Sequence, residues 1–311
     1  MSTAFVLSGG GSLGAAQVGM LQALGRSGIE PDLLVGISAG ALNALWVADH
    51  GMGRESLERL AATWVGLRRK DVFPLQPTRV LEGVLGRTRA LCSSDRLETL
   101  IRTNAGVNML EDTATPVHVL ATDLLSGDDF LISSGSASDA ILASAAIPGI
   151  FPPMWLDGRW LVDGALTASS GVTQAVRLGA SVVYVLPGGV PCALPRPPRS
   201  AVGVALHALT LLIAQRLLAE VAGPVGATVR LLPPLCPVTV SASDFTQAER
   251  LIRRARTSST RWLAKGGPDL PHPERFLSLH DHRSEGQSGV SSGAGTHSST
   301  SCHESGRSRT A

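Results

Sequence analysis

Two glycine-rich turns, each directly after a short apolar run, constrain the fold of this 311-residue chain more than any other feature. The run "AFVL" at residues 4–7 leads into "SGGGSLG", and the run "LLVGI" at residues 33–37 leads into "SAG". Helical patterns follow the two turns, at residues 14–26 and 39–49. Apolar runs that alternate with helices are typical of βαβ units, and therefore of an α/β protein with a mostly parallel sheet.

Further strand signals extend this pattern along the chain. Asp157-Gly158 between apolar residues predicts a hairpin. Residues 244–265 predict a last helix. Other apolar runs of strand length lie at residues 117–124, 129–134, 181–187 and 227–234.

The composition changes near the C-terminus. From residue 283 onward the chain contains no Leu, Ile, Met or aromatic residue. Such a segment cannot bury enough apolar surface to offset the entropy of ordering it. We therefore predict one folded domain over residues 1–270 and a polar, disordered tail over residues 271–311.

Charge and cysteine content argue against several classes of protein. The net charge of +2 argues against binding to nucleic acid. The four cysteines form no C-x-x-C pair, which predicts a reducing compartment and no metal site or disulfide framework. The first residues lack the basic segment of a secretory signal, so we expect a cytoplasmic protein. Sixteen uncharged residues precede Arg216 in the stretch 200–222, which is too few to span a bilayer and predicts a buried core helix.

The second turn, "GISAG" at residues 36–40, decides between two functions that the first turn allows. A dinucleotide-binding unit also begins with a strand, G-x-G-x-x-G and a helix, but it needs an acidic residue at the carboxyl end of its second strand. Here Glu30 and Asp32 precede that strand. G-x-S-x-G at a strand-to-helix turn is instead typical of a nucleophile elbow, which predicts Ser38 as a nucleophile.

The glycines of the two turns have separate predicted roles. Gly36 and Gly40 leave out side chains that would collide at the tight turn around Ser38. The turns after neighbouring parallel strands open onto the same edge of a sheet, so the backbone N–H groups of the first turn would face the carbonyl under attack. Such donors stabilise an oxyanion. The predicted oxyanion hole consists of Gly9, Gly10 and Gly11.

A serine nucleophile needs a general base, and we favour Asp163 in "WLVDGAL". Asp163 closes an apolar strand and precedes Gly164, so its carboxylate can lie beside the elbow, where burial would raise its pKa. A Ser–His–Asp triad is the alternative, and it would depend on His118 or His207. Both histidines lie within apolar segments, which favours structural roles for them.

With "GGGSLG", "GISAG" and "VDGA" in this order, and "ASAAIPGIFPP" at residues 143–153, the chain resembles the patatin-like phospholipase family over residues 4–265. Gly14 completes the first of these motifs. The resemblance implies a three-layer α/β/α fold and a catalytic dyad of Ser38 and Asp163. It also implies hydrolysis of acyl esters of phospholipids and other lipids, without calcium or any cofactor.

Two positions depart from the family pattern. Many members carry Arg or Lys where this chain has Leu13, and Asn-x-Pro where it has "SSG" at residues 169–171. The first change removes a positive charge near the oxyanion loop, and the second alters the loop after Asp163. Two alternatives to a hydrolase remain, a lipid acyltransferase that uses the same serine and a catalytically weak lipid-binding protein.

The segment 57–70 raises the question of membrane contact. It carries apolar residues at helical spacing and ends in three cations. Such a helix could bind an anionic lipid surface as a peripheral contact. We favour a lid or cap helix whose apolar face packs on the core. The apolar positions are Leu57, Leu60, Ala61, Trp64 and Leu67.

Overall fold

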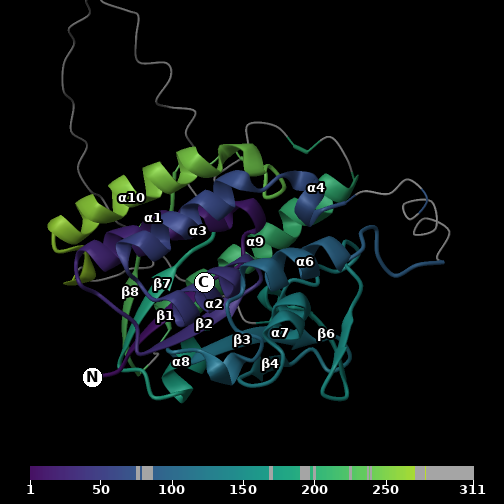
Figure 1. Cartoon of the computed structure of the whole chain (residues 1–311), viewed down its shortest axis with the longest axis horizontal. Helices are drawn as coiled ribbons and strands as arrows, with labels where there is room; N and C mark the ends of the chain where they lie inside the picture. Colours follow the sequence, from purple (N-terminus) through teal and green to yellow (C-terminus); the bar gives the residue numbers. More distant parts are fainter. Residues whose placement is uncertain are drawn as a thin grey trace, which may run out of the picture. The chain divides into compact units, whose positions relative to one another are not determined.

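A twisted sheet of mostly parallel strands forms the centre of the computed structural model (Figure 1). The described strands are ordered β5-β6-β3-β2-β1-β7-β8, and β4 pairs with β3 along the edge opposite β2 and β6. Strands β3, β2, β1, β7 and β8 run parallel, whereas β4, β5 and β6 are antiparallel additions at one side. The strands are β1 Thr3–Leu7, β2 Leu33–Ile37, β3 Val117–Asp123, β4 Asp129–Ile132, β5 Met154–Leu156, β6 Arg159–Asp163, β7 Val182–Leu186 and β8 Thr228–Leu231.

The structure describes residues 1–74, 78, 87–167, 171–189, 197–198, 201–223, 226–236, 238, 240–269 and 277. Within these residues the helices are α1 Gly14–Arg26, α2 Ala39–His50, α3 Arg54–Gly66, α4 Arg69–Val72, α6 Asp95–Asn104, α7 Ala137–Ser144, α8 Val172–Arg177, α9 Ala201–Ala222 and α10 Ala248–Ala264. Short 3₁₀ turns lie at Gly11–Leu13, Leu110–Asp112, Gly164–Leu166, Phe245–Gln247 and Gly267–Asp269.

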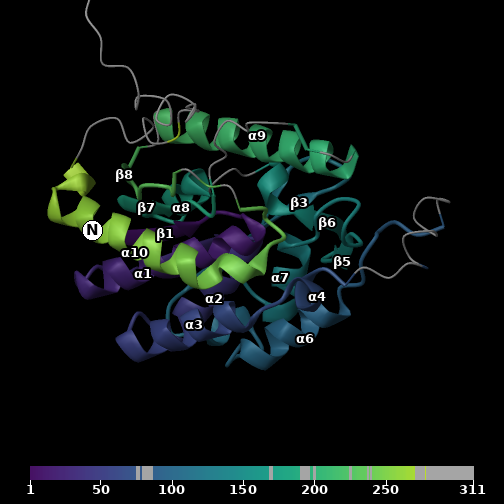
Figure 2. The same cartoon turned by 90° about the horizontal axis from the view of Figure 1, so that it is seen from above.

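Alternate residues of the central strands point to opposite faces of the sheet, and both faces are covered by helices. Phe5 and Leu7 of β1 pack into a large cluster with residues of α1, α2, α3, α7 and α10. Ala4 and Val6 face the opposite way, into a cluster with residues of α8 and α9. Figure 2 shows α9 along one side of the sheet and α1, α3 and α10 along the other. The three-layer α/β/α architecture is therefore confirmed.

The chain divides into a unit of residues Met1–His280 and a second unit of residues Asp281–Ala311. Except for Leu277, the predicted tail at 271–311 lies outside the described residues. Leu277 is buried in the cluster on the α8 and α9 side of the sheet.

The prediction that residues 200–222 form a buried core helix is wrong in part. The segment is helical as α9, but Val204 is 50% exposed and Leu212 is 63% exposed. Ala214, Leu217 and Val221 are the described α9 residues that are buried, because an outer-layer helix turns only one face toward the sheet. No helix among the described residues is long and apolar enough to cross a membrane.

The apolar face of the segment 57–70 points into the protein. Leu57, Leu60, Trp64 and Leu67 are all buried, and they belong to the large core cluster. The interpretation of this segment as a helix packed on the core is thus confirmed, and its apolar face is not available to a lipid surface.

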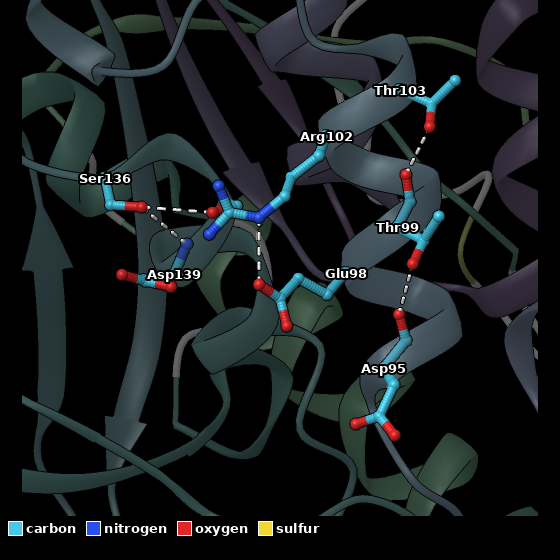
Figure 3. Close-up of polar contacts among 8 residues, drawn as sticks. Asp95, Glu98, Thr99, Arg102, Thr103, Ser136 and Asp139 are labelled. Atoms are coloured by element: carbon cyan, nitrogen blue, oxygen red, sulfur yellow. Dashed lines mark hydrogen bonds and ion pairs between the residues drawn. The ribbon is translucent and has the colours of Figure 1, made fainter.

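Local polar contacts form along α6 and at the start of α7 (Figure 3). On α6, Arg102 and Glu98 form an ion pair one turn apart, with 2.9 Å between Nε and Oε1. At the start of α7, the backbone N–H of Asp139 donates to the hydroxyl of Ser136. Ser136 therefore caps this helix.

The predicted hairpin at Asp157-Gly158 is present between β5 and β6. Both residues have positive φ, 50° for Asp157 and 73° for Gly158. Two such residues in succession make the tight turn that suits the twist of antiparallel strands. The hairpin positions β6, whose last residue is Asp163.

Candidate active site

Ser38 lies at the sharp turn between β2 and α2, in a backbone conformation that L-residues rarely adopt. Its φ is 53° and its ψ is −123°, and it is 7% exposed. A Cβ added to Gly36 would lie 2.5 Å from the Cα of Ala41, and one added to Gly40 would collide with the carbonyl oxygen of Leu7. The two glycines therefore allow α2 to pack directly onto the strand ends.

The register of the sheet places Asp163 at the same height as Ser38. Ile37, at the end of β2, pairs with Leu120 of β3, and Asp163, at the end of β6, pairs with Ala121 of β3. β4 pairs with β3 along the opposite edge, so β2 and β6 follow one another along the same edge of β3. The nucleophile candidate and the base candidate thus meet where these two strands end. The structure brings together two residues that lie 125 positions apart in the sequence (163 minus 38).

The carboxyl group of Asp163 is buried, with 6% of the residue exposed. One of its oxygens accepts a hydrogen bond from the backbone N–H of Ala165 at 2.9 Å. Burial raises the pKa of Asp163 from 3.8 to about 6, while hydrogen bonds from the Ala165 N–H and from the side chain of Ser38 oppose that rise. A Cβ on Gly164 would collide with the carbonyl oxygen of Leu120, so glycine is required beside this carboxyl group.

The first glycine-rich loop lies against Ser38. A Cβ built on Gly9 would be 3.3 Å from the Cβ of Ser38, and one on Gly10 would be 2.8 Å from the carbonyl oxygen of Gly188. Gly11 has a φ of 56°. Within the described residues, the backbone N–H groups of these three glycines donate to no protein acceptor. In the part of the chain that the structure describes, the loop thus has backbone donors without a protein acceptor, and Gly9 brings it next to the Ser38 side chain.

Neither histidine of the alternative triad joins this group of residues. His118 contacts Ser133 at 2.8 Å between Nδ1 and Oγ, and burial lowers its pKa. It pairs with Val35 on β2, three residues before the level of Ser38, which corresponds to roughly 10 Å along a strand. His207 lies in α9. Among the described residues, no hydrogen bond connects either ring with Ser38 or Asp163.

The two departures from the family pattern have different structural contexts. Leu13 is partly buried and packs on the large core cluster, and its side chain leaves no room for a Cβ on Gly189. Gly14 begins α1 and faces the ring of Trp64, 2.8 Å from where its Cβ would be. Gly171 caps α8 with a φ of 84°, whereas residues 169 and 170 lie outside the described part of the chain.

Ser144 at the end of α7 is a contact of Ser38 that no sequence motif predicts. The backbone N–H of Ser38 donates to the Ser144 hydroxyl at 2.8 Å, and that hydroxyl donates to the carbonyl oxygen of Leu120 at 2.5 Å. Ser144 is fully buried, so this bridge between the elbow and β3 is shielded from water. Its place in "ASAAIPGIFPP", a segment already noted for the family resemblance, is the only signal in the sequence.

The chain combines a three-layer α/β/α fold, a G-x-S-x-G elbow and a buried carboxyl group beside the elbow serine. These features define a class of α/β proteins whose site has the geometry of a serine hydrolase. The model of the patatin-like phospholipase family matches residues 5–176, which include Ser38, Asp163 and the first glycine loop. The chain belongs to the patatin-like phospholipase family.

Similar proteins include several named after neuropathy target esterase. An uncharacterized NTE family protein of Mycobacterium tuberculosis is 31% identical over 164 residues, which are 52% of this chain and 42% of that protein. A lysophospholipase, nte1, of Aspergillus oryzae is 27% identical over 195 residues, 60% of this chain and 12% of the relative. The crystal structure of VipD from Legionella pneumophila matches with a TM-score of 0.43 and 15% identity, covering 85% of this chain and 67% of VipD. The chain thus spans less than half the length of the Mycobacterium tuberculosis and Aspergillus oryzae relatives.

Proposed function

We propose that this protein is a serine acyl hydrolase of lipid esters, with Ser38 as nucleophile, Asp163 as general base and the Gly9–Gly11 loop as oxyanion hole. The observation that carries the proposal is the position of the Asp163 carboxyl group. It is buried next to the Ser38 side chain, with a pKa of about 6. A carboxylate with a pKa near the working pH is a better base than one in water.

The proposed reaction has two steps. Asp163 takes the proton of the Ser38 hydroxyl as the oxygen attacks the ester carbonyl, and the glycine N–H groups stabilise the oxyanion that forms. The leaving alcohol then takes the proton from Asp163, and an acyl group remains on Ser38. In the second step, Asp163 removes a proton from water, which attacks the acyl group, and the proton passes to Ser38 as the fatty acid leaves.

Family membership and the names of relatives support lipid esters as the substrate class. The Aspergillus oryzae relative is named a lysophospholipase. We therefore propose a lysophospholipid as substrate, with no cofactor. Incubation with lysophosphatidylcholine should release free fatty acid at a rate proportional to enzyme concentration. Acyl transfer to added glycerol with no free fatty acid would contradict the hydrolase and favour the acyltransferase.

The activity should depend on pH in the direction set by Asp163. Only the ionised carboxylate accepts a proton, so kcat/KM should fall as the pH drops below about 6, approaching a tenfold loss for each pH unit. Initial rates on a soluble short-chain ester between pH 4 and pH 9 measure this profile. A profile that is flat between pH 4 and pH 7 would contradict the role of Asp163 as base.

A further inference from the structure

A buried chain of polar side chains connects three helices with the start of the glycine loop. The side chain of Gln17 on α1 donates from Nε2 to the carbonyl oxygens of Ser8 and Leu186, at 2.7 Å and 3.0 Å. Asn43 on α2 donates from Nδ2 to the Gln17 Oε1 at 2.8 Å, and Trp64 on α3 donates from Nε1 to the Asn43 Oδ1 at 2.8 Å. Gln17 and Asn43 are fully buried, and Trp64 is 3% exposed.

The donor and acceptor groups of these side chains allow only one direction of donation along the series of hydrogen bonds. An indole N–H can donate but cannot accept, so Asn43 must turn its oxygen toward Trp64. The Asn43 nitrogen then faces Gln17, which must turn its own oxygen toward Asn43. Both hydrogens of the Gln17 nitrogen are thereby directed at the two carbonyl oxygens. The second hydrogen of the Asn43 nitrogen is used as well, because it donates to the carbonyl oxygen of Gly14 at 3.0 Å.

The carbonyl group that Gln17 holds belongs to the peptide that carries the Gly9 N–H. In a trans peptide, the C=O and the N–H point in opposite directions. With the Ser8 oxygen held toward α1, the Gly9 N–H must point away from α1. A Cβ on Gly9 would lie 3.3 Å from the Cβ of Ser38, so the side chain of Ser38 is a close neighbour of this peptide.

We propose that Gln17 is a positioning residue for the oxyanion hole, fixed in its role by Asn43 and Trp64. The inference rests on the proposed function, because an oxyanion forms only if Ser38 attacks an ester. The three hydrogen-bonded side chains prevent rotation of the Ser8–Gly9 peptide. Such a rotation would take the Gly9 N–H out of the site. Helices α1, α2 and α3, which supply the three side chains, lie next to one another (Figure 2).

The test compares Gln17→Met with Gln22→Met. Methionine keeps the length of glutamine but cannot donate. Gln22 is a matched control because it is also a buried glutamine of α1, and its amide nitrogen contacts Leu57 instead of the glycine loop. We expect Gln17→Met to lower kcat at least ~10-fold with KM within about 2-fold, since oxyanion donors act in the transition state. Gln22→Met should change both constants less than about 2-fold, as expected for a residue outside the site.

A second readout follows the Gly9 amide in ¹H–¹⁵N spectra of the protein without substrate. Its resonance should shift in Gln17→Met and stay in place in Gln22→Met. An unmoved Gly9 resonance, or a loss of kcat no larger than in the control, would overturn the inference. If Ser38→Ala keeps full activity, the proposed function fails, and the Gly9 resonance alone decides on the role of Gln17. Should Gln17→Met fail to fold, Trp64→Phe, which keeps an aromatic ring but removes the indole N–H, is judged by the same two readouts.

Discussion

Ser38→Ala is expected to reduce hydrolysis of lysophosphatidylcholine by ~10⁴-fold or more. Removal of the nucleophile leaves only what binding and the oxyanion donors contribute, as the large losses from nucleophile substitutions in serine hydrolases indicate. The fold should be retained, because alanine occupies the same backbone conformation and the backbone N–H of residue 38 can still donate to Ser144. Fatty acid release and thermal unfolding of the variant measure the two effects.

Ser138→Ala is a matched control for this substitution. Ser138 is also a buried serine, 7% exposed, and its hydroxyl contacts Ser136 at the start of α7. Its loss should leave the rate within about 2-fold of the unmodified protein. A Ser38→Ala variant that is as active as Ser138→Ala would rule out Ser38 as the nucleophile.

Asp163→Asn is expected to lower kcat/KM by ~10³-fold to 10⁴-fold, since an amide cannot accept the proton of Ser38. Asparagine has the shape of the carboxyl group, and its oxygen can keep the hydrogen bond from the Ala165 N–H. Asp157→Asn on the same hairpin is the control, because it removes an exposed carboxylate and asparagine tolerates the positive φ. Equal activity of these two variants would contradict the assignment of Asp163.

Asp163→Asn should also stabilise the protein at neutral pH. Asp163 has a pKa of about 6 in the folded state and 3.8 as its ordinary value, so the folded state binds more protons between these two values. The free energy of unfolding therefore decreases as the pH rises from about 4 to about 6, with a total loss on the order of 2–3 kcal/mol. Asp163→Asn lacks this loss. Urea unfolding should show the variant more stable at pH 7 and equal to the unmodified protein near pH 4.

The strand ends that form the site could be predicted because the signals are local. Glycines around Ser38 and before the first helix mark turns where a side chain would collide, and an aspartate followed by glycine at the end of an apolar strand marks a strand end. These features depend on close neighbours in the sequence. The meeting of Ser38 and Asp163 along one edge of β3 follows from the sheet register, which no short motif describes.

The contacts behind the site were not predictable because their partners are distant or their residue types are ambiguous. Ser144 meets Ser38 from a position 106 residues later, and Gln17 meets Leu186 across 169 residues. A single polar residue in an apolar helix, as at Gln17 or Asn43, gives no indication of what it contacts. For α9, an apolar composition could not distinguish a helix inside the core from one on the outer layer with Leu212 exposed.

The whole proposal depends on one serine oxygen that becomes acylated at the tip of β2. A fluorophosphonate that reacts covalently with activated serines, followed by proteolysis and mass spectrometry, tests this most directly. We expect a single modified serine, Ser38, and much slower labelling of Asp163→Asn. No modification of the folded protein, or modification of a different serine, would contradict the proposed mechanism.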